Sequence, residues 1–161
     1  MKNFKRNPHL LAQAAMIGAI YVVLFYAFAA FGTDAIQVRI AEALTILPYF
    51  TIAAIPGVTI GCFLSNLIAG SLIDAIFGTL ATLIAAIFTY QLRKYKFLAP
   101  VPPIVCNALI IPWVLRFGYA VALPIPYMML TVGIGEVISV GIIGMILLFA
   151  LDRYKEQLFK N

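Results

Sequence analysis

The sequence predicts an all-α membrane protein: a bundle of six transmembrane helices with the amino and carboxyl termini in the cytoplasm. Its composition is the first reason, because 64% of the 161 residues are hydrophobic and only 11% are charged, whereas soluble domains are roughly 45–50% apolar and about 25% charged. The second reason is that Lys and Arg gather in short clusters around and between the apolar runs. Six spans of ~20 residues need about 120 residues, so we expect residues 1–161 to form a single membrane domain.

Six apolar runs, separated by charged or turn-forming residues, define the predicted spans. They cover residues 10–31, 39–50, 56–70, 74–91, 104–119 and 126–151. Pro56 and Pro126 open the third and sixth runs, and Asp74 opens the fourth, since proline and acidic residues suit the first turn of a helix. The second run is short for a complete crossing, and Pro48 predicts that it ends or kinks there. Pro112 predicts a kink in the fifth run.

Clusters of basic residues predict the orientation of these spans. They are Lys2, Lys5 and Arg6, then Arg93, Lys94 and Lys96, then Arg153, Lys155 and Lys160. Cytoplasmic flanks of membrane proteins are enriched in Lys and Arg, and six spans place all three clusters on that side. Five or seven spans would misplace one cluster. We therefore interpret the net charge of +5 as a marker of topology. We expect these basic residues to face a lipid bilayer and not to bind nucleic acid.

The sequence lacks the residue patterns of most catalytic and metal sites. It has no glycine-rich phosphate loop that ends in Gly-Lys-Ser or Gly-Lys-Thr. Its single histidine, His9, and its two cysteines, Cys62 and Cys106, have no metal-type spacing. We therefore expect no enzyme activity, no metal and no cofactor. Energy for uphill transport would have to come from an ion gradient or from another polypeptide.

Polar residues at membrane depth are the candidate binding residues, because burying them in hydrocarbon is costly. Glu136 lies about twelve residues beyond Pro124, which is ~18 Å along a helix and near the middle of a ~30 Å hydrocarbon core. Gly133 and Gly135 beside it leave room for a flat ligand. The alternative is that Glu136 forms a hydrogen bond to a neighbouring helix.

Five further polar residues are candidate substrate ligands, each with a structural alternative. Arg39 and Glu42 are spaced i and i+3, so they lie on one helix face and equally suit a self-neutralising ion pair. Asp74 suits the dipole of the helix that it begins. Asn66 and Asn107 offer donors and an acceptor to a base-like edge, or else bridge helices; counting along the span places Asn107 nearer the inner side. Several of the acids lie in the outer half, so we expect a pocket that opens outward.

Small residues in the first span form a candidate helix-contact face. Ala15 and Ala19 are four residues apart, as are Ala14 and Gly18. This spacing lets another helix approach closely. Both a partner protein and a helix of the same bundle remain possible occupants of this face.

Several motifs, in order along the chain, resemble those of the QueT family. They are Arg39-Ile-Ala-Glu-Ala-Leu-Thr-Ile-Leu-Pro48, Gly61-Cys62-Phe-Leu-Ser-Asn66, Phe77-Gly78-Thr-Leu-Ala-Thr-Leu83, Asn107-Ala-Leu-Ile and Gly135-Glu136. Members of this family are substrate-binding S components of energy-coupling factor (ECF) transporters for queuosine precursors. The resemblance implies a multi-pass protein of a prokaryotic plasma membrane that works with a coupling transmembrane subunit and two ATPase subunits. The family's Ala-x-x-x-Ala motif, which contacts the coupling subunit, would correspond to Ala15 and Ala19.

The resemblance also implies a substrate of the 7-deazaguanine or queuine type. Glu136 would accept from the guanine-like edge, Asn107 or Asn66 would donate to the carbonyl oxygen, and Glu42 or Asp74 would bind an amine. The alternatives are an S component for another vitamin-like molecule, a standalone carrier of small solutes, and a membrane scaffold.

Overall fold

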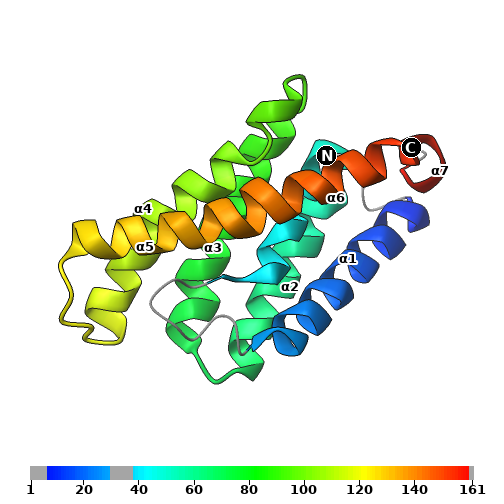
Figure 1. Ribbon diagram of the computed structural model, residues 1–161. Coiled ribbons are helices and arrows are strands. Elements are labelled where there is room, and N and C mark those ends of the chain that lie inside the picture. Colours follow the sequence, from blue (N-terminus) through cyan, green and yellow to red (C-terminus); the bar gives the residue numbers. More distant parts are fainter. Residues whose placement is uncertain (1–6, 30–37, 160–161) are drawn as a thin grey trace.

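The computed structural model describes residues 7–29 and 38–159, and every regular element within them is helical (Figure 1). The elements are α1 (Pro8–Ala27), η3 (Ile40–Tyr49), α2 (Ala54–Ile68), α3 (Leu72–Gln91), η4 (Lys96–Leu98), α4 (Val101–Gly118), α5 (Ile125–Glu136), η5 (Val137–Gly144), α6 (Met145–Asp152) and α7 (Lys155–Leu158). The first basic cluster, the end of the first predicted span, and Lys160 lie outside the described residues. The predicted all-α class is confirmed for the part of the chain that the structure describes.

Among the described residues, four helical segments are long and apolar enough to cross a membrane. They are Pro8–Ala27, Leu72–Gln91, Lys96–Gly118 and Ile125–Asp152. The third predicted span corresponds to α2, which has only 15 residues. The second corresponds to η3, a 3-10 helix of ten residues, which the sequence did not predict. The count of six spans and the cytoplasmic side of both termini stay predictions.

Helices that follow one another in the chain pack side by side, and η3 lies among them. α1 packs on α2, α2 on α3, α3 on α4 and α4 on α5, while η3 contacts η5, α3 and α1 (Figure 1). All eight residues from 41 to 48 are buried. Pro48 lies inside η3 and donates no backbone hydrogen bond. The chain thus places a short, wholly buried helix where a span was expected.

The contact between α1 and α2 depends on glycine. A Cβ atom added at Gly61 would lie 2.7 Å from the Cβ of Tyr21, and one added at Gly57 would lie 2.9 Å from the backbone oxygen of Ala14. Only residues without a side chain allow two helix backbones to approach so closely. Ala14 and Gly18 are both buried in this contact, so these two small residues serve packing inside the molecule.

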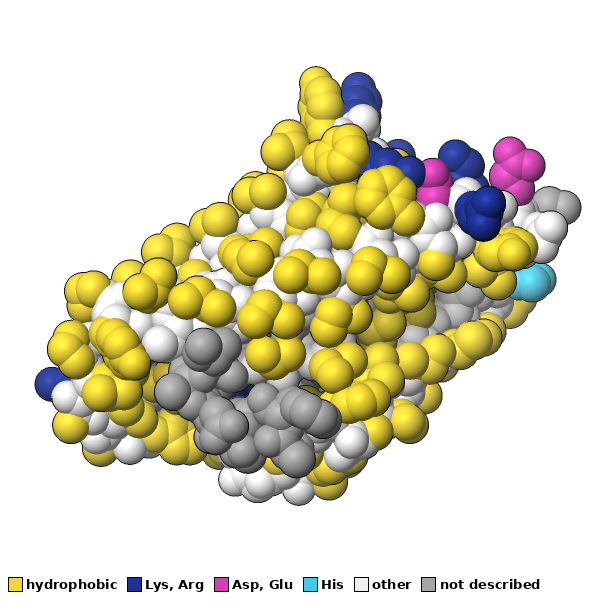
Figure 2. Space-filling model, in the orientation of Figure 1, with side chains coloured by type: hydrophobic (Ala, Val, Ile, Leu, Met, Phe, Trp, Pro, Cys, Tyr) yellow, Lys and Arg dark blue, Asp and Glu magenta, His cyan; other side chains and the backbone are white. Residues whose placement is uncertain are grey.

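The exterior of the molecule is far more apolar than that of a soluble protein. Figure 2 shows hydrophobic side chains over most of the visible face, with charged side chains gathered at the α6–α7 end. Large apolar side chains such as Phe117, Leu11 and Ile146 are more than 60% exposed, whereas Glu42 and Glu136 are buried. Such an apolar exterior suits contact with lipid tails.

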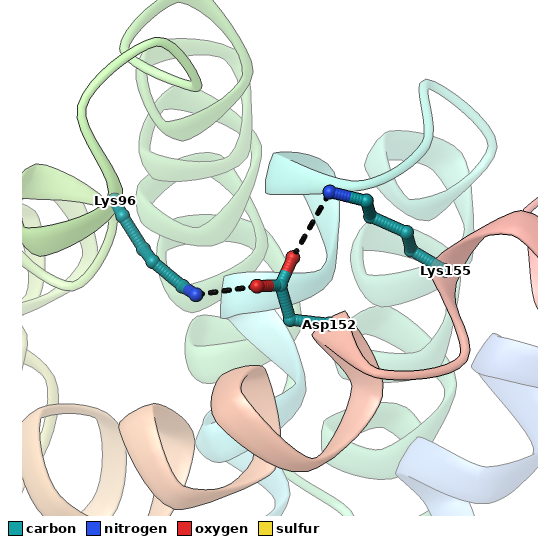
Figure 3. Close-up of polar contacts among 3 residues, drawn as sticks. All are labelled: Lys96, Asp152 and Lys155. Atoms are coloured by element: carbon teal, nitrogen blue, oxygen red, sulfur yellow. Dashed lines mark hydrogen bonds and ion pairs between the residues drawn. The ribbon is translucent and has the colours of Figure 1, made fainter.

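Charged residues at one end of the molecule join the chain segments that meet there. The Lys96 Nζ atom lies 2.5 Å from Asp152 Oδ2, and Lys155 Nζ lies 3.6 Å from Asp152 Oδ1 (Figure 3). The Gln13 side chain donates a 3.0 Å hydrogen bond to the backbone oxygen of Leu158, so the start of α1 lies beside α7. Described members of the second and third basic clusters therefore share one end, as the topology prediction requires.

Candidate functional site

Polar side chains from several helices meet inside the otherwise apolar bundle. Glu42, Asn66, Asn107 and Glu136 are each no more than 4% exposed. They belong to four different elements, η3, α2, α4 and α5. Because buried polar groups are costly unless they are paired, this convergence marks the interior as the candidate site.

The Glu42 carboxyl group is held by α1. Its Oε1 atom accepts a 2.6 Å hydrogen bond from the hydroxyl of Tyr21, which is only 2% exposed. Glu42 lies in the first turn of η3, where its backbone oxygen accepts a 2.6 Å hydrogen bond from the Thr45 hydroxyl. Its Oε2 atom is buried and has no hydrogen-bond partner among the described residues. One oxygen is therefore fixed and the other is available to a ligand.

The Glu136 carboxyl group lies where α5 passes into a π-helix. α5 ends at Glu136, and the next eight residues form η5 before α6 continues the same rod. Such π-helical segments are uncommon and occur frequently at functional sites. The Oε2 atom of Glu136 and the hydroxyl of Ser139 are buried, and neither has a hydrogen-bond partner in the described part of the chain. Unpaired buried groups of this kind are rare in folded proteins and suit a polar ligand.

Asn107 on α4 is the buried amide that lies near both carboxyl groups. Its side-chain amide lies beside both Glu42 and Glu136. The expectation that Asn107 lies nearer the inner side came from starting its helix at residue 104. α4 begins at Val101, with Pro102 in its first turn, so Asn107 lies about one turn further into the helix. Asn107 is still in the first half of α4, so its expected depth nearer the inner side stays a prediction.

Arg39 brings a positive charge to the same region. It precedes the first residue of η3, and its charge acts on Glu42, Asp74, Glu136 and the Tyr21 hydroxyl. Arg39 has an extended backbone conformation and Glu42 lies in the first turn of η3. The two residues thus lie in the same region, and an ion pair between them stays a prediction.

A cavity of about 200 Å³ adjoins Arg39 and is also lined by Asn66 and Asp74. The Asn66 amide donates toward Cys62 Sγ at 3.4 Å and toward the Asp74 backbone oxygen at 3.5 Å. The Asp74 carboxylate accepts a 2.6 Å hydrogen bond from the Tyr119 hydroxyl.

The structure brings the six predicted substrate residues into one region: Glu42, Glu136, Asn107 and Arg39 near one another, with Asn66 and Asp74 beside Arg39 at the cavity. Their role in binding stays a prediction.

Sequence reasoning missed Tyr21, whose hydroxyl holds the Glu42 carboxyl group. A phenol hydroxyl in the middle of an apolar span needs a buried partner, and that requirement was the available signal.

The predicted partner-contact face divides into two parts. Ala15 and Ala19 are exposed on α1, while Ala14 and Gly18 are buried against α2. A partner can reach the first pair in this structure. The second pair is occupied by internal packing, because the backbone oxygen of Gly57 would lie only 3.1 Å from a Cβ atom at Gly18.

The functional groups of the candidate site suit the binding of a small polar molecule. The site presents carboxylate oxygens, amide groups and a guanidinium group, which recognise a small molecule rich in N–H donors and carbonyl oxygens. Its cavity is smaller than the ~300 Å³ at which typical ligand pockets begin. Within the described residues, no group of three or more His, Cys, Asp or Glu side chains is arranged to hold a metal ion.

Comparison with known proteins identifies the family. The family model described as QueT transporter matches residues 11–153. The chain is 33% identical over 82 residues to the queuosine precursor transporter QueT of Lactococcus lactis subsp. cremoris (strain MG1363), an alignment that covers 50% of this chain and 48% of that protein. The match thus spans about half the length of that relative, and no solved structure matches. The motif resemblance is confirmed: this membrane protein belongs to the QueT transporter family.

Proposed function

We propose that this chain is the substrate-binding S component of an ECF-type importer and that it binds a queuosine precursor from outside the cell. The observation that carries the proposal is the pair of buried, unpartnered carboxylate oxygens, Oε2 of Glu42 and Oε2 of Glu136. A carboxylate that is desolvated but only half satisfied gains a strong interaction when a ligand donates to it. The related protein named as a queuosine precursor transporter supports this choice of substrate.

A 7-deazaguanine fits the donor and acceptor pattern of the site. Its ring N–H and exocyclic amine point the same way, so Glu136 accepts from both. Asn107 or Asn66 donates to the carbonyl oxygen, and Glu42 or Asp74 binds an amine substituent. The charge of Arg39 acts on these carboxylates and keeps them from repelling one another before the ligand arrives.

Energy for transport comes from partner subunits in this proposal. The sequence has no phosphate-binding glycine loop, so a coupling transmembrane subunit and two ATPase subunits would supply ATP hydrolysis. Exposed Ala15 and Ala19 on α1 offer the close-approach surface for the coupling subunit. The chain would cross a prokaryotic plasma membrane several times as one domain, with both termini inside.

Mass spectrometry of small molecules that co-purify with the protein tests the ligand, and titration calorimetry with queuine and other 7-deazaguanines tests affinity. We expect binding by the isolated chain and no uphill uptake by liposomes that contain this chain alone. Absence of binding across these compounds and the water-soluble vitamins would favour a scaffold. Uptake by such liposomes, driven only by an ion gradient, would instead identify a standalone carrier.

A further inference from the structure

A hollow of about 730 Å³ lies at the charged end of the molecule. Its lining includes Arg93 and Lys94 after α3, Lys155 on α7, and the aromatic residues Phe50 and Phe159. The candidate spans end or begin at Gln91, Lys96 and Asp152. The hollow therefore lies at the level where lipid head groups meet the ends of the spans.

Positive charge exceeds negative charge in this hollow. Lys96 and Lys155 share a single carboxylate, Asp152 (Figure 3). In the described residues, neither Arg93 nor Lys94 forms an ion pair, although the Arg93 guanidinium lies 4.3 Å from the ring centroid of Tyr90. The other acid of the lining is the exposed Glu156. The surplus charge favours an anion.

An apolar groove of about 490 Å³ lies beside the hollow, between α1 and the η5–α6 segment. Met16 and Ile20 form one wall, Leu147 is on the opposite wall, and Leu44 of η3 is also in the lining. Phe159 lines both the groove and the hollow. It stacks on Phe50 with ring centroids 5.0 Å apart and planes 8° from parallel. Polar and apolar compartments therefore meet at one residue.

We propose that the hollow and the groove together bind one anionic phospholipid. The head-group phosphate lies among Arg93, Lys94 and Lys155, and one acyl chain lies in the groove beside Leu147. Basic pockets at the ends of membrane helices recognise lipid phosphates, and the groove adds contact with the hydrocarbon that a soluble phosphate lacks. Phe159 lies at the junction, where the glycerol backbone passes from head group to chain.

Thermal unfolding of the full chain in a neutral detergent tests the proposal. Phosphatidylglycerol should raise the melting temperature and remain bound in native mass spectra, whereas phosphatidylcholine should do neither. Soluble glycerol 3-phosphate should have little effect, because it cannot fill the groove. Equal stabilisation by both lipids would overturn the proposal. Full stabilisation by glycerol 3-phosphate would overturn it as well, since the hollow would then bind free phosphate.

Variants separate the two compartments. Lys94→Gln and Lys155→Gln should each weaken phosphatidylglycerol binding about fivefold, the effect of removing one basic charge near a membrane surface. Arg116→Gln is the control, because Arg116 lines a different pocket, with Leu123 and Pro124. An equal loss with Arg116→Gln would mean that net charge alone attracts the lipid, and this would overturn the proposed site.

Leu147→Trp fills the groove and should also weaken phosphatidylglycerol binding by at least fivefold. Melting without added lipid, together with helical content by circular dichroism, shows that the variant folds; Leu147→Phe, a smaller enlargement, is the alternative if it does not. If the groove variant abolishes cellular uptake but leaves lipid binding unchanged, the groove belongs to a protein partner and the lipid proposal is overturned.

Discussion

The Tyr21 hydroxyl donates a 2.6 Å hydrogen bond to Oε1 of Glu42, and both side chains are buried. Through this contact the helix that exposes Ala15 and Ala19 on one face fixes a site carboxylate on another. The candidate substrate site and the proposed partner surface therefore share one helix, α1.

Tyr21→Phe should destabilise the protein by about 1–3 kcal/mol, the cost of leaving a buried acceptor unsatisfied, and should weaken ligand binding. Thermal unfolding in detergent and titration calorimetry measure the two effects. Tyr26→Phe is the matched control on α1, because the Tyr26 hydroxyl donates to the backbone oxygen of Ser65 instead. Equal effects of both variants on ligand affinity would contradict the proposed role of Tyr21.

Glu136→Gln should lower ligand affinity at least tenfold, since a hydrogen bond to a charged group contributes about 1.5–3 kcal/mol. The unliganded protein should keep its melting temperature, because the amide has nearly the shape of the carboxyl group and removes a buried acid. Calorimetry with the co-purifying ligand measures the change, with Glu156→Gln, at an exposed position, as control. An affinity within twofold of the parent would remove Glu136 from the site.

Ala15→Leu with Ala19→Leu should abolish uptake in cells while leaving ligand binding intact, because the larger side chains block close helix approach. Uptake of labelled substrate and calorimetry on the purified protein give the two readouts. Val23→Met, at an exposed position of the same helix, serves as the control. If the paired variant loses ligand binding, this face serves folding and not a partner.

Gly61→Ala should destabilise the fold by about 1–3 kcal/mol through overpacking, because its Cβ would lie 2.7 Å from that of Tyr21. Gly133→Ala is the contrasting variant, since its Cβ would make an ordinary 3.7 Å contact with Ala108 and alanine favours helix. Thermal unfolding of both in the same detergent measures the difference. If Gly61→Ala melts at the same temperature as the parent protein, α1 and α2 can move apart without loss of stability, and the close contact is not required.

The membrane class and the polar site could be predicted because both follow from composition and from the cost of burying charge. The conformation of residues 40–49 could not, since periodicity does not separate a short α-helix from a 3-10 helix. Tyr21 was missed because its role depends on the approach of α1 to α2 at Gly61. The start of α4 was predicted three residues too late, at residue 104, because the prolines before it suit a connection as well as the first turn of a helix.

The tight coil of η3 determines how far this segment reaches. A 3-10 helix rises about 2.0 Å per residue, against 1.5 Å for an α-helix, so the ten residues of η3 cover about 20 Å instead of about 15 Å. This extra length connects Arg39, beside the cavity, with Phe50, which stacks on Phe159 at the opposite end of the helix. One mostly buried helix thus spans from the candidate cavity to the charged end of the molecule.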